Sequence, residues 1–116
     1  MKTINYEDLK KLIDTNADYI LIDVREPAEI KKYGAIPTSI NIPFDKLSHV
    51  FSFSQKEFKD KYGKTFALKT KFIFYCRSGN RSSHATNYAL GKGYNAINYS
   101  GSANDWSLYD VNVKGY

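Results

Sequence analysis

Two short apolar runs constrain the fold of this chain most strongly. They cover residues 19–24 and 71–75, and both are rich in branched and aromatic side chains. Each run is too short for a buried helix, and a strand with apolar residues on both faces is typical of a parallel sheet covered by helices. Because 116 residues suffice for one core, the sequence predicts a single domain over residues 1–116.

The remaining elements alternate between helix and strand. Alternation of this kind predicts an α/β protein with parallel strands, right-handed crossovers and helices on both faces of the sheet. Ligands of such sheets bind at the carboxyl ends of the strands. One helix is expected to begin at Tyr6, and others are expected over 27–33, 82–92 and 104–108. Two or three short helices are expected within 44–68, and further strands are expected over 40–42 and 96–99.

Composition excludes several classes of protein. A single cysteine rules out an intramolecular disulfide, and with only His49 and His84 as other soft ligands no metal site is expected. No apolar run approaches the ~18 residues of a membrane span, and the first residues do not form a signal peptide, so a cytoplasmic location is predicted. The net charge of +5 comes from scattered lysines, which does not indicate a nucleic-acid partner.

The three arginines are placed differently from the lysines. Arg25 follows the first apolar run, and Arg77 and Arg81 follow the second. The planar guanidinium suits oxyanions and buried ion pairs. Because the carboxyl ends of parallel strands share one edge of the sheet, both arginine-bearing segments are expected to meet there.

The only cysteine, Cys76, stands between the second apolar run and a helix. The small and polar residues after it, including Gly79, allow the backbone N–H groups to turn inward as an anion-binding nest. The helix N-terminus and the charges of Arg77 and Arg81 add positive potential. Such surroundings lower a cysteine pKa to about 3.5–7.5, so a thiolate is expected without a histidine base, a cofactor or a metal.

Two reactions suit a thiolate in such a nest. The thiolate can attack the outer sulfur of a sulfane-sulfur donor, or it can attack phosphate or arsenate. The segment from Cys76 to Arg81 has the spacing C-x4-R, one residue less than the C-x5-R of phosphatases of this general design. Because one added sulfur atom is smaller than a bound tetrahedral oxyanion, the shorter loop favours sulfur transfer.

The chain resembles the single-domain rhodaneses, a family of sulfurtransferases, over about residues 4–109. The matching segments are LIDVRE (21–26), GAIP (34–37), SINIP (39–43), FYCRSGNRS (74–82), Gly93-Tyr94, NYSG (98–101) and Trp106. The resemblance implies an about five-stranded, mainly parallel sheet wrapped by helices, and a persulfide on Cys76. Two positions depart from the family, which often has histidine in place of Ala35 and a second glycine in place of Ser102.

The candidate site follows from these patterns. Cys76 is the expected catalytic residue, and Asp23, Arg25 and Trp106 are supporting candidates. Arg81 has two open roles, anion binding and a structural pair with Asp23 or Glu26, and Arg25 is expected to be structural. The expected substrate-binding residues are Arg77, Ser78, Gly79, Asn80, Arg81 and Ser82.

The predicted function is transfer of a sulfane sulfur through Cys76. The expected partners are a small anionic donor such as thiosulfate and an acceptor that is a thiol, cyanide or a protein, and neither nucleic acid nor a membrane is expected as a partner. A persulfide carrier or sulfide-responsive module is an alternative, and a cysteine-dependent phosphatase or arsenate reductase is a second one. The sequence does not determine the oligomeric state or the physiological donor and acceptor.

Overall fold

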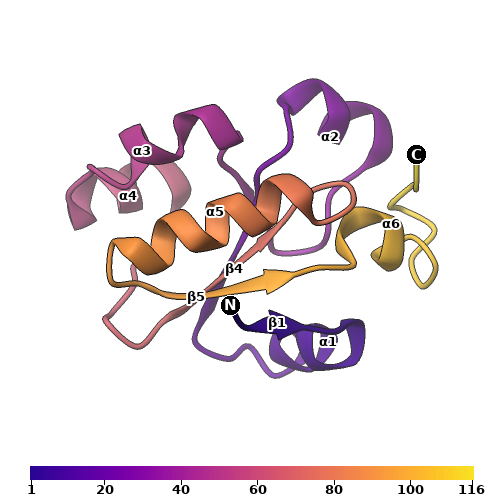
Figure 1. Cartoon of the computed structure of the whole chain (residues 1–116), viewed down its shortest axis with the longest axis horizontal. Helices are drawn as coiled ribbons and strands as arrows, with labels where there is room; N and C mark the ends of the chain where they lie inside the picture. The colour runs from indigo at the N-terminus through magenta and orange to yellow at the C-terminus, as the bar shows by residue number, and fades with distance from the viewer.

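The computed structural model describes residues 1–116 and contains a five-stranded sheet in the order β1-β5-β4-β2-β3 (Figure 1). Every strand pairing is parallel, which confirms the predicted α/β class. The strands are β1 (Thr3–Ile4), β2 (Tyr19–Asp23), β3 (Ile40–Asn41), β4 (Lys71–Tyr75) and β5 (Asn95–Tyr99). The helices are α1 (Tyr6–Asp14), α2 (Pro27–Tyr33), the 3₁₀ turn η1 (Phe44–Lys46), α3 (Leu47–Val50), α4 (Gln55–Tyr62), α5 (Asn80–Gly91) and α6 (Ser102–Trp106).

The central strands are buried on both faces. Because successive strand residues point to opposite sides, each apolar run contributes to two separate cores. Ile20 and Phe72 belong to the core beneath α3, α4 and α5, whereas Leu21 and Ile73 belong to the core beneath α1 and α6. No helix has both the length and the apolar character needed to cross a membrane.

Helix boundaries follow local signals in the sequence. The Asn5 side chain accepts a hydrogen bond from the Asp8 N–H at 2.9 Å and caps α1. Pro27 occupies the first turn of α2, where its missing N–H costs nothing, and Gly34 ends that helix with φ 86°. The three pieces within residues 44–62 agree with the prediction of two or three short helices.

The differences from the prediction include two helix starts and one additional strand. The helix expected at 82–92 begins at Asn80, because Gly79 adopts a left-handed conformation and its carbonyl accepts the first helical bond from Ser83 at 3.0 Å. The last helix begins at Ser102 and not at residue 104. Strand β1 was not expected, since two residues carry no periodicity, and it pairs with β5 at the edge of the sheet.

Candidate active site

The Cys76 loop, residues 76–82, leaves the carboxyl end of β4 and enters α5. The Cys76 side chain is only 1% exposed. Backbone N–H groups of Gly79 and Ser82 point at its sulfur, with nitrogen-to-Sγ distances of 3.2 and 3.4 Å, and the Ser82 hydroxyl oxygen lies 3.5 Å from Sγ. The loop is therefore the nest that the sequence predicts, and the sulfur sits at its centre.

The tight curvature of the loop depends on Gly79. Its φ is 97°, a region that residues with a side chain rarely adopt. A Cβ atom at this position would also collide with the backbone carbonyl of Ser100, which follows β5. Because the loop packs this closely on the neighbouring strand end, its inward N–H groups are held in place before any substrate binds.

Ser102, at the start of α6, is hydrogen-bonded to the first residue of the loop. Its hydroxyl accepts a hydrogen bond from the Cys76 N–H at 3.1 Å and donates one to the Tyr99 carbonyl at 2.8 Å. The Ala103 N–H, one residue further on, donates to the Cys76 carbonyl at 2.9 Å. Ser102 has φ 58°, which explains why glycine is common here in the family, and its hydroxyl gives this chain a contact that glycine cannot make.

The surroundings of Cys76 favour the thiolate. Burial alone raises the pKa of the Cys76 thiol. Hydrogen bonds from the Ser82 hydroxyl and from the N–H groups of Ser82, Gly79 and Ser78 lower the pKa by more than burial raises it, so the net pKa lies below its usual value. These donors stabilise the charged form directly. The backbone nest and Ser82, more than the arginines, therefore account for the acidity of the thiol.

Replacing Ser82 with alanine is expected to raise the pKa of Cys76, because it removes a hydroxyl donor and leaves the backbone N–H groups. Alkylation by iodoacetamide then slows several-fold at neutral pH, and the midpoint of its pH–rate profile moves to higher pH. Ser83→Ala is the matched control, since the Ser83 hydroxyl makes no contact with Sγ. An unchanged profile in Ser82→Ala would show that the hydroxyl does not contribute.

Arg77 is exposed, and its guanidinium makes no hydrogen bond or ion pair with the protein. Its carbon Cζ lies 4.7 Å from the centre of the Tyr116 ring. A guanidinium that lies against a ring keeps its N–H donors free. Of the two arginines in the loop, Arg77 is therefore the one whose guanidinium is not engaged in an ion pair.

Arg81 is already paired. Its guanidinium donates two hydrogen bonds to the Glu29 carboxylate, at 2.7 and 3.0 Å, and this pair holds the pKa of Glu29 down at about 2. The predicted partners Asp23 and Glu26 are wrong, because Asp23 pairs with Arg25 and α2 presents Glu29 to α5. The geometry favours a bracing role for Arg81, and anion binding by this residue stays a prediction.

Asp23 and Arg25 form a buried ion pair under the site. Arg25 Nη2 lies 2.7 Å from Asp23 Oδ2, and both side chains are almost completely inaccessible. Arg25 also donates to the Gly34 carbonyl at 2.8 Å, so the pair ties the end of β2 to the end of α2. Neither side chain forms a hydrogen bond with Cys76, and this agrees with the structural role expected for Arg25.

The other candidates lie at the edge of the site or outside it. Ser78 and Asn80 are exposed at the turn into α5. Trp106 is buried in the core beneath α1 and donates to Asp110 at 3.0 Å, and it makes no hydrogen bond to the Cys76 loop. His84 is exposed, with its ring near Phe44, and forms no contact with the sulfur. No group of three or more side chains is arranged to hold a metal ion.

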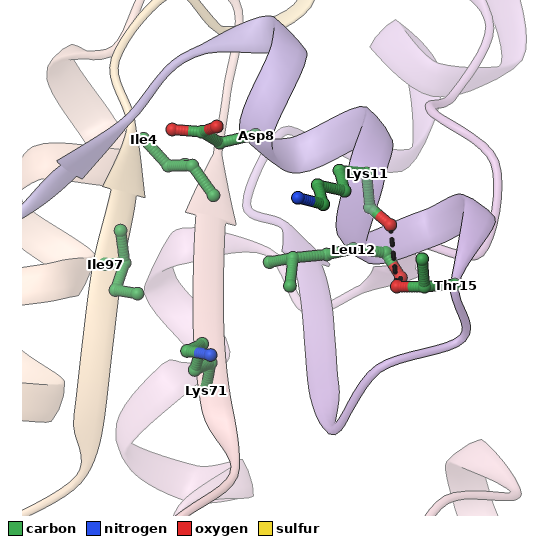
Figure 2. Close-up of a pocket in the computed structure, with 7 residues that line it drawn as sticks. All are labelled: Ile4, Asp8, Lys11, Leu12, Thr15, Lys71 and Ile97. Atoms are coloured by element: carbon green, nitrogen blue, oxygen red, sulfur yellow. Dashed lines mark hydrogen bonds between the residues drawn. The ribbon is translucent and has the colours of Figure 1, made fainter.

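The largest hollow in the surface is separate from this site. Its volume is about 320 Å³. Figure 2 shows it between α1 and strands β4 and β5. It is lined by Ile4, Asp8, Lys11, Leu12, Thr15, Lys71 and Ile97. None of these residues belongs to the Cys76 loop, so this hollow is not part of the candidate site.

A parallel α/β sheet with a cysteine at its carboxyl edge, in a loop whose backbone N–H groups point at the sulfur, is typical of cysteine-dependent transferases and hydrolases. Within that class the chain belongs to the rhodanese family, because the profile of the Rhodanese-like domain matches residues 5–109. The family resemblance predicted from the sequence is confirmed.

Curated relatives and solved structures agree with this family. The chain is 42% identical over 104 residues to the Drosophila melanogaster rhodanese domain-containing protein CG4456, covering 88% of this chain and 93% of that one. It is 36% identical to the Saccharomyces cerevisiae thiosulfate:glutathione sulfurtransferase, covering 91% and 78%. The human single-domain sulfurtransferase TSTD1 superposes with a TM-score of 0.84 at 28% identity, covering 95% and 98%. These relatives support sulfurtransferase activity.

The location in the cell is not decided by these relatives. Two further relatives, a putative thiosulfate sulfurtransferase of Schizosaccharomyces pombe and the thiosulfate sulfurtransferase RDL2 of S. cerevisiae, carry the word mitochondrial in their names. The cytoplasmic location predicted from the sequence therefore stays a prediction.

Proposed function

We propose that residues 1–116 act as a single sulfurtransferase domain that carries the transferred sulfur as a persulfide on Cys76. The observation that carries the proposal is the set of backbone N–H groups aimed at a buried Sγ whose pKa is lowered. A persulfide is also an anion at neutral pH. The same donors can therefore hold the thiolate before transfer and the persulfide after it.

The proposed reaction has two steps. The Cys76 thiolate attacks the outer sulfur of thiosulfate, a new S–S bond forms, and the S–S bond of thiosulfate breaks with the electron pair leaving on sulfite. A nucleophilic acceptor then attacks the outer sulfur of the persulfide, takes it, and regenerates the Cys76 thiolate. Cyanide serves as the acceptor in an assay, and thiocyanate is its product.

The proposed classes of sulfur donor and acceptor are supported by the Arg77 side chain and by the name of one relative. The free guanidinium of Arg77 suits an anionic donor. The name of the S. cerevisiae relative gives thiosulfate as donor and glutathione as acceptor for that protein. We therefore propose thiosulfate and a low-molecular-weight thiol as the first pair to test. Repeated turnover with this pair supports a transferase, whereas loading once without turnover indicates a persulfide carrier.

Arg77→Ala is expected to weaken the use of thiosulfate by roughly 10- to 100-fold in kcat/KM, since a hydrogen bond to a charged group contributes about 1.5–3 kcal/mol. An organic persulfide donor is affected much less, because it presents no sulfonate group for Arg77 to bind. Steady-state kinetics with both donors measures the difference. An equal loss on both donors would contradict an anion-binding role for Arg77.

A further inference from the structure

The segment after α6 folds back to the edge of the sheet that carries the Cys76 loop. Figure 1 shows the end of the chain beside α2 and α6. The Lys114 N–H donates to the Tyr33 carbonyl at 2.7 Å, and the Tyr116 N–H donates to the Asn104 side chain at 3.1 Å. These contacts bring Tyr116 to the candidate site, although it is distant from Cys76 in the sequence.

Tyr116 contacts the residues that surround the loop. Its ring stacks on Tyr33 with centroids 3.6 Å apart and planes 2° from parallel, and the Arg77 guanidinium lies 4.7 Å from the ring centre. Its hydroxyl donates to Glu29 Oε1 at 2.7 Å, on the carboxylate that binds Arg81. The Tyr116 side chain therefore contacts Arg77 directly, and it is connected through Glu29 to Arg81 at the start of α5.

We infer that Tyr116 is a positioning residue, which holds the Arg77 guanidinium beside the Cys76 loop and thereby favours anionic reagents at Cys76. The inference rests on the proposed function, since it names the residue that sets the preference for anionic donors. An exposed arginine without other partners samples many rotamers, and fixing it against a ring removes that freedom before the anion binds. The ring uses the face of the guanidinium and leaves its N–H donors for the anion.

The hydroxyl and the ring of Tyr116 have separable roles. The stacking on Tyr33 and the contact with Arg77 depend on the ring. The hydroxyl donates to Glu29 and accepts a longer hydrogen bond from Arg25 Nη1 at 3.4 Å. Tyr116→Phe is therefore expected to keep most of the effect on Arg77, whereas Tyr116→Ala loses it. Tyr109→Ala is a matched control, because Tyr109 also stacks on a tyrosine, Tyr6, but its side chain forms no hydrogen bond or cation–π contact with the loop.

The test compares alkylation of Cys76 by iodoacetate, which is an anion, with alkylation by iodoacetamide, which is neutral. The ratio of the two rates measures guidance by positive charge and cancels changes in thiolate fraction. Tyr116→Ala is expected to lower the ratio about two- to fivefold, the change that a cation–π contact at an exposed site corresponds to. In an Arg77→Ala background the same substitution is expected to have no further effect.

Each result decides the inference. A lower ratio in Tyr116→Ala that is absent in Arg77→Ala, with Tyr116→Phe and Tyr109→Ala close to the unsubstituted protein, supports it. An unchanged ratio, or an equal fall with and without Arg77, overturns it. Alkylation requires no sulfur transfer, so a failure of the proposed function would appear separately, as absence of persulfide formation with thiosulfate.

Discussion

Replacing Cys76 with serine is expected to abolish the transfer of sulfur from thiosulfate to cyanide while the protein stays folded. A hydroxyl stays protonated at neutral pH and forms no persulfide, so the first step loses its nucleophile and the second step has no persulfide for the acceptor to attack. The side chain is 1% exposed and the substitution is nearly isosteric, so the packing around it is preserved. Thiocyanate formation measures activity, and circular dichroism with urea denaturation measures the fold.

A residual rate close to that of the unsubstituted protein would contradict the assignment of Cys76 as nucleophile. Loss of the fold would instead show that the sulfur is needed for packing. Because Cys76 is the only cysteine in the chain, no second thiol can replace it.

The second large effect is a loss of folding stability, which is expected when the buried Asp23–Arg25 ion pair is broken. Asp23→Asn removes the counter-charge of Arg25 and leaves a guanidinium in the interior, where Asp23 accepts its bonds at 2.7–3.2 Å. Breaking a buried pair in this way costs about 3–5 kcal/mol. Domains of this kind are typically stable by only about 5–15 kcal/mol, so the variant is expected to be close to unfolding at ambient temperature. Urea denaturation measures the free energy of unfolding.

Asp14→Asn is the control for the buried pair. Asp14 is bound by Lys10 at the same 2.7 Å distance, but both side chains are substantially exposed. Exposed pairs are screened by solvent, so little change in the urea midpoint is expected. Equal midpoints for Asp14→Asn and Asp23→Asn would contradict the view that the buried pair anchors this edge of the sheet.

Much of the fold could be predicted because its signals are local. The apolar runs at 19–24 and 71–75 coincide with β2 and β4, and Pro27 and Gly34 mark the ends of α2. Strand β1 could not be predicted, since its two residues acquire a strand conformation only by pairing with β5. The early start of α5 depends on the conformation of Gly79, which is set by its contact with the end of β5 and not by its neighbours in sequence.

The candidate site likewise has a part that could be predicted from neighbouring residues and a part that depends on residues distant in the sequence. The Cys76 loop could be located because all of its N–H donors lie within seven consecutive residues. Glu29 could not be assigned to Arg81, because they are 52 residues apart and the sequence does not show which carboxylate α2 presents. Ser102 and Tyr116 were missed for the same reason, although the serine at a position where the family often has glycine was a signal that could have drawn attention to Ser102.

The measurement that tests the central claim most directly is the intact mass of the protein before thiosulfate, after thiosulfate, and after subsequent cyanide. The account predicts a gain of one sulfur atom with thiosulfate, its removal by cyanide, and no gain in Cys76→Ser. A folded protein with a free thiol that gains no mass, or a gain that persists in Cys76→Ser, would contradict a persulfide on Cys76.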